Sequence, residues 1–386
     1  MPTVAFVTNV VPIYRYPVFE ALRISERFRF RILVTVPLSE SCREAIDTLP
    51  MTHSAAFNLS YSTVHSSTGA TQREFLALPM SMLGDLIRCR PDIIVSGDLG
   101  VRSLVCWCAA RILGARFVLW SEDIASSAGG RSRLQQRLRR FLVRRADAFL
   151  AWGAPAQSYL RGLNVPRQRI YTCAQAIDND YWLHQARTLD RQEQRRALGF
   201  RAVTFLLVGR ALPLKGFQNF LKAWSSLPQD LHARASAVLV GDGEYLPDLQ
   251  ELAGMLSLKN VTFAGAKSAH ELARYYAASD IFVFPSLVDV WGLVVNEAMC
   301  FGLPILASQH AGASQALVAN SGVGVIFNPS NIDEFASRLR EWAERPPARD
   351  STACHQILKD VTFNASSAAI QQMIDEVKTV RGPSGK

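Results

Sequence analysis

The chain has 386 residues, of which 49% are hydrophobic and 19% are charged. This composition excludes a disordered or fibrous chain and provides enough apolar core for two globular domains. The formal net charge of +9 favours an anionic partner, and nucleic acid, a membrane surface and a phosphorylated substrate all meet that condition.

The N-terminal half has the pattern of a parallel sheet with helices between its strands, because short apolar runs alternate with amphipathic segments. Strands are expected at 4–8, 30–36, 92–96, 117–120 and 148–152, and helices at 18–25, 75–89, 101–113 and 155–162. The polar residues 40–75 predict loops with short strands. No basic segment precedes the first strand, so a signal peptide is not expected. Seven cysteines without a CxxC pair indicate reduced, mostly buried thiols in the cytoplasm.

Two loops of this half contain candidate acceptor-side residues, because parallel sheets bind ligands at the carboxyl ends of their strands. Tyr14 and Arg15 lie in the loop 9–17, which either meets a substrate or is an ordinary connection. Glu122 follows the strand at 117–120 and, with Asp123, either belongs to a site or caps a helix.

The segment from Arg131 to Arg145 contains seven arginines interleaved with apolar residues, which predicts a basic amphipathic helix. Leu134, Leu138 and Phe141 share one face and are expected to pack on the sheet. The arginines exceed what the solvation of a surface helix requires. The helix is therefore a candidate for binding an anionic membrane surface, with a plain surface helix as the alternative.

A second α/β unit follows a polar segment at 187–198, which is expected to be a linker with a short helix. Strands are expected at 202–208, 237–240, 261–264, 281–284, 304–307 and 322–327, and helices at 217–227, 246–256, 269–278, 332–344 and 366–380. The first of these strands ends in Gly209 and Arg210, and Lys215 precedes the next helix. Two cations above a helix N-terminus suit a diphosphate, and a solvated basic turn is the alternative.

The stretch from Pro285 to Met299 is the most informative part of the chain. Asp289 and Glu297 lie eight positions apart, across a Gly-containing turn and the start of a predicted helix. Backbone N–H groups at a helix start can hold phosphate, and carboxylates can accept hydrogen bonds from sugar hydroxyls.

With these motifs the chain resembles a GT-B glycosyltransferase of family 4, among the retaining, metal-independent group 1 transferases. The resemblance is most specific from Phe284 to Pro304, where Asp289 and Glu297 stand at the positions of the family's E-x7-E carboxylates. It extends to Gly209-Arg210, Lys215-Gly216 and Gly241-Asp242-Gly243, and is weaker at Pro12–Arg15 and Ile177-Asp178.

The resemblance implies a role for each motif residue. Arg210 and Lys215 would neutralise the diphosphate of the donor, and Asp289 would hold hydroxyls of the transferred sugar. Glu297 would accept hydrogen bonds from the ribose. The remaining donor-binding residues would be Gly209, Trp291, Gly292, Leu293 and Val294, with backbone N–H groups contacting phosphate or sugar oxygens. No metal and no other cofactor is expected, since two cations and a helix dipole supply the positive charge.

Two departures from the family pattern affect these roles. Asp289 replaces the family's first Glu with a carboxylate one methylene shorter, which predicts altered sugar geometry more than lost activity. Many members carry a His after the strand at 117–120, where this chain has Ser121-Glu122-Asp123. Glu122 is the candidate for that position, as a base for the acceptor hydroxyl.

The predicted fold is α/β of the GT-B type, with two Rossmann-like domains facing a central cleft. Residues 1–185 would form the acceptor-side domain, on which the helix at about 362–380 packs back, and residues 186–361 the donor-nucleotide domain. The predicted function is sugar transfer from a nucleoside-diphosphate sugar to an acceptor hydroxyl in polysaccharide or glycolipid assembly. The alternatives are a GT-B-fold sugar-nucleotide epimerase and a non-catalytic sugar-nucleotide-binding protein.

The expected partners are the nucleotide-sugar donor and an acceptor that is either lipid-linked or soluble. The basic helix Arg131–Arg145 favours the lipid-linked acceptor and a peripheral position on the inner face of the cell membrane. Nucleic acid is not expected, because the positive charge is concentrated in one helix and one cleft without an aromatic-basic reader module.

Overall fold

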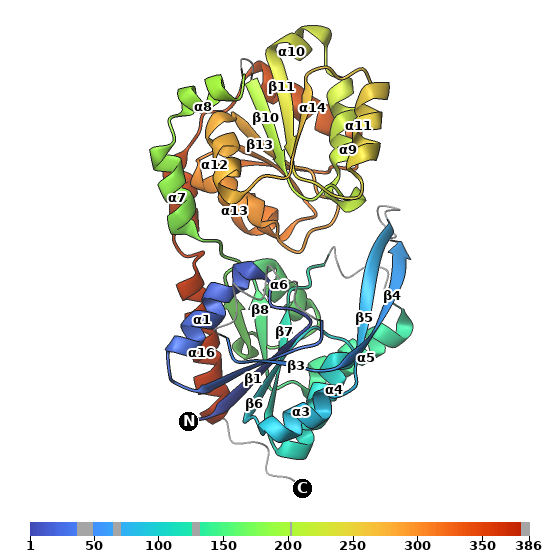
Figure 1. Cartoon of the computed structure of the whole chain (residues 1–386), viewed down its shortest axis with the longest axis vertical. Helices are drawn as coiled ribbons and strands as arrows, with labels where there is room; N and C mark the ends of the chain where they lie inside the picture. Colours follow the sequence, from blue (N-terminus) through green and yellow to red (C-terminus); the bar gives the residue numbers. More distant parts are fainter. Residues whose placement is uncertain (37–48, 65–70, 126–131, 201–202, 380–386) are drawn as a thin grey trace. The chain divides into compact units, whose positions relative to one another are not determined.

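The structure, a computed structural model, describes residues 1–36, 49–64, 71–125, 132–200 and 203–379. These residues form two compact units, each with its own parallel sheet (Figure 1). Unit 1 comprises the described residues up to Gln175 and those from Thr362 onward, and unit 2 comprises those from Ala176 to Val361. The chain passes into unit 2 before residue 185, because Trp182 is buried in the core of that unit.

Unit 1 is built on a seven-stranded sheet in the order β3-β2-β1-β6-β7-β8-β9, in which all neighbouring strands are parallel. The strands are β1 (Thr3–Thr8), β2 (Arg29–Val34), β3 (Met51–His53), β6 (Ile93–Gly97), β7 (Arg116–Ser121), β8 (Ala148–Trp152) and β9 (Ile170–Cys173). The strand order reverses between β1 and β6, where Val4 lies opposite Ile93. Such a reversal is the point at which doubly wound sheets bind ligands.

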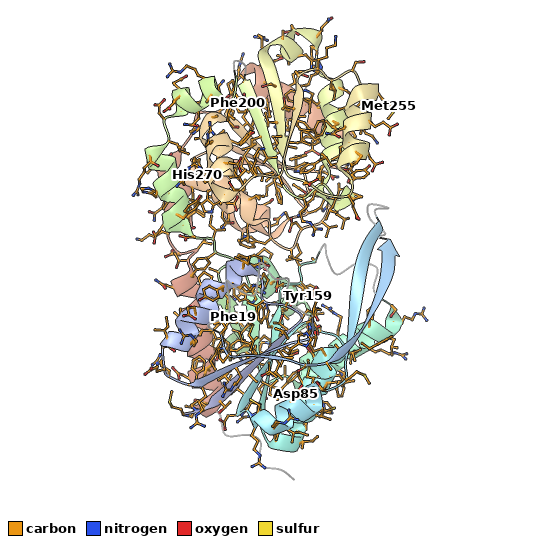
Figure 2. The ribbon with its side chains drawn as sticks, in the orientation of Figure 1. Phe19, Asp85, Tyr159, Phe200, Met255 and His270 are labelled. Carbon is orange, nitrogen blue, oxygen red and sulfur yellow. The ribbon has the colours of Figure 1, made fainter. Side chains whose placement is uncertain are left out.

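Both faces of this sheet are covered by helices. Successive side chains of a strand point to opposite faces, and β1 is buried at four consecutive positions, so both of its faces need cover. The helices are α1 (Tyr16–Ile24), α3 (Met82–Cys89), α4 (Val101–Leu113), α5 (Arg133–Arg145), α6 (Ala154–Gly162) and α16 (Phe363–Thr379). Val4 and Phe6 pack with α1 and α16, and Ala5 and Val7 pack with α3 to α6. Phe19 of α1 is fully buried in the first of these layers (Figure 2).

An antiparallel pair, β4 (Ala56–Val64) and β5 (Thr71–Pro79), precedes α3. Strands were thus rightly predicted within 40–75, although β4 and β5 are longer than expected, and the prediction of a helix from residue 75 was wrong over 75–79. Pro79 explains why the helix begins later, since proline lacks a backbone N–H and disfavours helical geometry in the residue before it.

Unit 2 contains a six-stranded parallel sheet in the order β12-β11-β10-β13-β14-β15. The strands are β10 (Val203–Val208), β11 (Ala235–Val240), β12 (Val261–Gly265), β13 (Ile281–Phe284), β14 (Ile305–Ser308) and β15 (Gly324–Phe327). The helices are α7 (Asn179–Thr188), α8 (Arg191–Ala197), α9 (Phe217–Ser225), α10 (Gln229–Arg234), α11 (Leu246–Met255), α12 (Ala269–Ala278), α13 (Leu293–Cys300), a π-helical turn (Ser314–Val318), α14 (Ile332–Glu344) and α15 (Ser351–Leu358). The strand order reverses between β10 and β13.

The segment predicted as a linker at 187–198 is part of unit 2. Arg195 of α8 donates a hydrogen bond of 2.8 Å to Asp280, which also accepts one of 2.8 Å from the Thr204 N–H at the start of β10. The segment is thus held to the sheet by buried polar contacts that its composition did not indicate.

The basic helix α5 is confirmed over Arg133–Arg145, whereas Arg131 lies outside the described residues. Of its predicted apolar face, Leu138 and Phe141 pack against the core, whereas Leu134 is 77% exposed. Leu142 and Val143, which were not predicted, are buried. Only the second half of α5 packs into the core of unit 1. Within the described part of the chain, no helix is long and apolar enough to cross a bilayer.

Candidate functional site

The candidate donor site lies where the strand order of unit 2 reverses. The loops that follow β10 and β13 leave neighbouring strands at their carboxyl ends. They are joined by a hydrogen bond of 2.8 Å from the Leu287 N–H to the Leu214 carbonyl. Gly216 allows this close approach, because a Cβ there would lie 2.0 Å from the Pro285 carbonyl oxygen and the φ of Gly216 is +70°.

Lys215 and Asp289 are brought together by this contact between the two loops. The Nζ of Lys215 lies 2.5 Å from Oδ2 of Asp289, and the two side chains are 25% and 13% exposed. Oδ1 of the same carboxylate accepts a hydrogen bond of 3.2 Å from the Trp291 N–H. Asp289 therefore orients the ammonium group and also fixes the turn before α13. An ammonium has three hydrogens, so the pairing leaves Lys215 able to donate to a ligand.

Arg210 lies on the same loop as Lys215, and its side chain is exposed. Its guanidinium makes no hydrogen bond or ion pair with any residue that the structure describes. The backbone beside it is fixed, since Gly209 donates to the Val240 carbonyl at 3.0 Å and Ala211 to the Asp242 carbonyl at 2.9 Å. The loop thus presents a cation that no carboxylate of the described chain neutralises.

The N-terminus of α13 adds backbone donors beside this pair. Gly292 precedes the helix with a φ of +101°, and a Cβ on it would lie 2.4 Å from the Phe284 ring, so only glycine fits. The N–H groups of Leu293 and Val294 have no acceptor among the described residues. They lie in the first turn of the helix, where the macrodipole favours an anion.

Trp291 does not offer its side chain to a ligand, although it was predicted among the donor-binding residues. The residue is 4% exposed, and its indole N–H donates to Asn296 at 3.0 Å. The indole therefore holds the turn against α13. Asn296 was not predicted, and the sequence contains no local signal for its contact.

Glu297 lies on α13 and is partly buried. Its Oε2 accepts a hydrogen bond of 2.8 Å from the Tyr276 hydroxyl, and Tyr276 is itself fully buried. Burial raises the pKa of Glu297 to about 7, and the Tyr276 hydrogen bond offsets part of that rise. Burial and the neighbouring carboxylate raise the pKa of Tyr276. Oε1 of Glu297 has no partner in the part of the chain that is described, so this oxygen is open to a ligand hydroxyl.

In unit 1, Arg15 and Glu122 form an ion pair at the carboxyl edge of the sheet, with an Nη1–Oε1 distance of 2.7 Å. Arg15 is only 3% exposed, and its guanidinium lies 4.6 Å and 4.4 Å from the ring centroids of Trp120 and Trp152. The loop position of Arg15 suggested that its side chain could meet a substrate. The side chain is instead buried and already paired with Glu122. Tyr14, by contrast, is 41% exposed.

The same group contains donors that the described residues do not satisfy. Nε and Nη2 of Arg15 and the indole N–H groups of Trp120 and Trp152 are buried without an acceptor among those residues. We call Arg15, Glu122, Trp120 and Trp152 the unit 1 cluster. Glu122 is its most accessible member, with a side chain 32% exposed.

Asp123, which was also considered for this site, has a structural role. It pairs at 2.5 Å with Arg139 of α5, and Arg139 also donates to the Tyr159 hydroxyl of α6 at 2.9 Å (Figure 2). Among the helices that the structure describes, neither Glu122 nor Asp123 is a cap, and the residue that caps α5 is Ser132.

A polar network at the strand-order reversal of unit 1 was not predicted. Arg102 is buried and bonds to Asn9, Asp98 and the Gly97 carbonyl. Asp98 follows β6 with a φ of +135°. The signal available was an acid flanked by glycines directly after a buried strand. The network fixes the two central loops of unit 1 and leaves Arg102 paired with a carboxylate.

The structure thus joins Lys215 with Asp289 and pairs Glu297 with Tyr276. Arg210 lies on the loop of Lys215, and the first turn of α13 follows the loop of Asp289. It joins Arg15 with Glu122 in the other unit. Across the described ranges, no three His, Cys, Asp or Glu side chains are grouped in a way that could hold a metal ion.

Known proteins are similar to the part of the chain that contains the candidate donor site. Residues 190–354 match the family described as glycosyl transferases group 1. The sulfoquinovosyl transferase SQD2 of Arabidopsis thaliana is 27% identical over 288 residues, which are 69% of this chain and 52% of the relative. A GDP-mannose-dependent monoacylated alpha-(1-6)-phosphatidylinositol monomannoside mannosyltransferase of Corynebacterium glutamicum is 30% identical over 171 residues, 42% of this chain and 43% of the relative. The chain thus spans about half the length of these curated relatives.

The fold has a match over nearly the whole chain. The structure of Anabaena Alr3699/HepE in complex with UDP has a TM-score of 0.76 at 18% identity, covering 97% of this chain and 100% of the other. The fold is therefore GT-B, as predicted.

Proposed function

We propose that the chain is a retaining glycosyltransferase that moves a sugar from a nucleoside-diphosphate sugar to an acceptor hydroxyl. The observation that carries the proposal is the combination of Arg210 and Lys215 with the open N–H groups of Leu293 and Val294, at the strand-order reversal of unit 2. Cations and helix N–H groups on two adjoining loops suit the negative charge of a diphosphate. A neutral sugar or a nucleobase would not need these cations.

In this proposal the cations act on the leaving group. The bond between the sugar and the diphosphate breaks with negative charge developing on the phosphate oxygen, and fixed cations lower the energy of that state. Lys215 is held in place by Asp289, so its charge needs no reorganisation during the reaction. The positive charge of Lys215, Arg210 and the α13 dipole would do this without a metal ion.

The carboxylates would position hydroxyl groups. The open Oε1 of Glu297 would accept from the ribose, while Tyr276 holds Oε2. Asp289 would accept from a hydroxyl of the transferred sugar. Backbone N–H groups would contribute more than the Trp291 side chain, which is buried.

Glu122 would serve the acceptor. Arg15 fixes its position from a buried, aromatic-lined site, and the partial exposure of Glu122 allows contact with a hydroxyl. A base must lie within hydrogen-bond reach of the proton that it removes, and Glu122 is the carboxylate of the unit 1 cluster that a ligand can reach. Arg15 is in this proposal a positioning residue.

The experiment that tests the function starts with thermal-shift screening of UDP, GDP, ADP and dTDP sugars. The stabilising donor is then incubated with a membrane lipid extract and with soluble sugars, and both the nucleoside diphosphate and the new glycoside are measured. We expect release of the diphosphate only together with glycoside formation. An epimerised nucleotide sugar formed without acceptor, or binding without any turnover, would contradict transfer.

We also propose that α5 binds an anionic membrane surface at its N-terminal half. Leu134 is 77% exposed, and the neighbouring Arg133 and Arg137 are exposed as well, so an apolar side chain projects between cations. Flotation with phosphatidylglycerol vesicles would detect the binding. We expect Leu134→Ser and Arg133→Glu/Arg137→Glu each to weaken it, with Met255→Ser, another exposed apolar side chain, as the control. Equal flotation of all these proteins would contradict the proposal.

A further inference from the structure

The C-terminal half of α5 borders a pocket that neither the donor site nor the unit 1 cluster uses. The pocket has a volume of about 400 Å³ and lies between α5 and the loop 163–169. Its polar side chains are Arg140, Arg144, Arg169 and Asn164. It lies at the edge of the sheet where β8 and β9 begin, because α5 ends just before Ala148 and the loop ends at Ile170. The unit 1 cluster, in contrast, follows the carboxyl ends of the strands.

Three arginines line this pocket, and no carboxylate is among the described residues that line it. Arg144 makes no hydrogen bond or ion pair with any residue described by the structure, and Arg140 makes only a long contact of 3.4 Å to the Gln136 carbonyl. The nearest acid in sequence, Asp147, is already paired with Arg116 at 3.1 Å and accepts the Phe117 N–H at 2.8 Å. The three charges therefore repel one another, and no carboxylate among the described lining residues compensates them.

One of the three arginines is held rigidly. Nε of Arg169 donates to the Asp147 carbonyl at 3.0 Å, and its guanidinium lies 5.6 Å from the centroid of the buried Phe149 ring. The remaining guanidinium hydrogens stay available. The other pocket walls are apolar, with Val143 and Val165 buried beneath the arginines. A fixed cation above an apolar floor, with two further arginines beside it, favours an anion site over a solvated surface.

We propose that this pocket binds a terminal phosphate group, one that carries two negative charges. Guanidinium groups bind phosphate oxygens through paired N–H donors, and three of them match the charge and the number of oxygens of a phosphate monoester. A carboxylate would use one arginine and leave two uncompensated. The phosphate comes either from a lipid head group or from a soluble phosphorylated compound. This site is separate from the donor site of unit 2 and does not depend on the proposed sugar transfer.

The test compares wild type with Arg140→Gln/Arg144→Gln and with the matched control Arg111→Gln/Arg161→Gln, whose arginines lie on α4 and α6 and not on the proposed membrane-binding half of α5. Both variants remove two exposed charges from unit 1. Binding of inorganic phosphate and glycerol phosphate is measured by calorimetry. We expect the pocket variant to bind at least about 10-fold more weakly than wild type and the control to bind as wild type, since two of three charge-assisted contacts are lost. A phosphate site in unit 2 adds the same binding to all three proteins, so the difference between the variants isolates the pocket.

The second arm identifies the source of the phosphate. Vesicles of phosphatidic acid are compared with phosphatidylglycerol vesicles of equal surface charge. A preference for phosphatidic acid that disappears in the pocket variant and survives in the control supports a lipid head group, and binding of soluble phosphate without that preference supports a soluble ligand. The inference is overturned if the pocket variant binds phosphate and phosphatidic acid as wild type does, or if the control loses both equally.

Discussion

The two units differ in whether the cations on the loops at their strand-order reversals are paired with carboxylates. In unit 1 the buried cations are neutralised, Arg15 by Glu122 and Arg102 by Asp98. In unit 2 the pair of Lys215 and Asp289 is joined by an unpaired, exposed Arg210 and by helix N–H groups without acceptors among the described residues. Loops at equivalent positions of the two sheets thus carry paired cations in unit 1, which we call the closed edge. In unit 2 they carry excess positive charge, which we call the electropositive edge. The difference supports the proposal that the donor diphosphate binds at the strand-order reversal of unit 2 and not at that of unit 1.

Removing the central cation of unit 2 should have the largest effect. We expect Lys215→Ala to reduce turnover about 10²–10³-fold, because a fixed charge on the leaving diphosphate is lost. The measurement is the rate of nucleoside diphosphate release from the stabilising donor. Lys222→Ala removes an exposed lysine of α9 in the same unit and should leave the rate unchanged. Equal rates for both variants would remove Lys215 from the reaction.

The turn before α13 should tolerate no side chain at Gly292. We expect Gly292→Ala to lower the free energy of unfolding by about 2–4 kcal/mol, through overpacking against Phe284 and a left-handed backbone. Gly254→Ala in α11 is the control, since nothing lies within 4 Å of its Cβ position, and it should stabilise by about 0.5–1 kcal/mol. Denaturant unfolding measures both. A neutral Gly292→Ala would mean that the turn can relax.

The closed edge of unit 1 should contribute to transfer and not to donor binding. We expect Glu122→Gln to reduce glycoside formation about 10²-fold as a base is lost, while the affinity for the donor stays unchanged. Asp123→Asn is the matched control, because Asp123 pairs with Arg139 and should affect stability without affecting transfer. If Glu122→Gln retains full transfer, Glu122 is only the partner of Arg15.

The burial of Glu297 should make stability and binding depend on pH. Burial raises its pKa in the folded state to about 7, above the ordinary value of 4.5, so the folded state binds more protons than the unfolded state between these pH values. The free energy of unfolding should therefore fall by on the order of 1–3 kcal/mol as pH rises from about 4.5 to about 7. Glu297→Gln should abolish that decrease, which denaturant unfolding at several pH values measures.

Ribose hydroxyls that donate to Glu297 would favour its charged form and lower its pKa again. Nucleotide binding near pH 6.5 should then release a fraction of a proton, which calorimetry in buffers of different ionisation enthalpy measures. Proton release that persists in Glu297→Gln would assign it to another group.

Sequence patterns predicted the parts of the site that depend on local order. The cations after β10, the carboxylates around α13 and the glycine turn stand at fixed spacings in one strand-loop-helix motif. The contact of Tyr276 with Glu297 joins two helices, and the enclosure of Arg15 by Trp120 and Trp152 joins three separate segments. Neither contact has a periodic signal, because each depends on how the sheet brings distant residues together.

The exposure of Leu134 was missed for a related reason. Amphipathic periodicity identifies the apolar face of a helix but not how far the helix extends along the core, and the core of unit 1 covers only the second half of α5. The start of α3 shows the opposite case. Pro79 indicated locally that the helix begins after it, but the apolar pattern from residue 75 suggested an earlier start.

The most direct test of the central claim is calorimetric titration of a nucleoside diphosphate into wild type and Arg210→Gln/Lys215→Gln. The titrant is the diphosphate of the donor that stabilises wild type. If the electropositive edge of unit 2 holds the diphosphate, the double variant should bind at least about 100-fold more weakly, since two charge-assisted contacts are lost. Binding of equal strength in the double variant would contradict the assignment of the donor site.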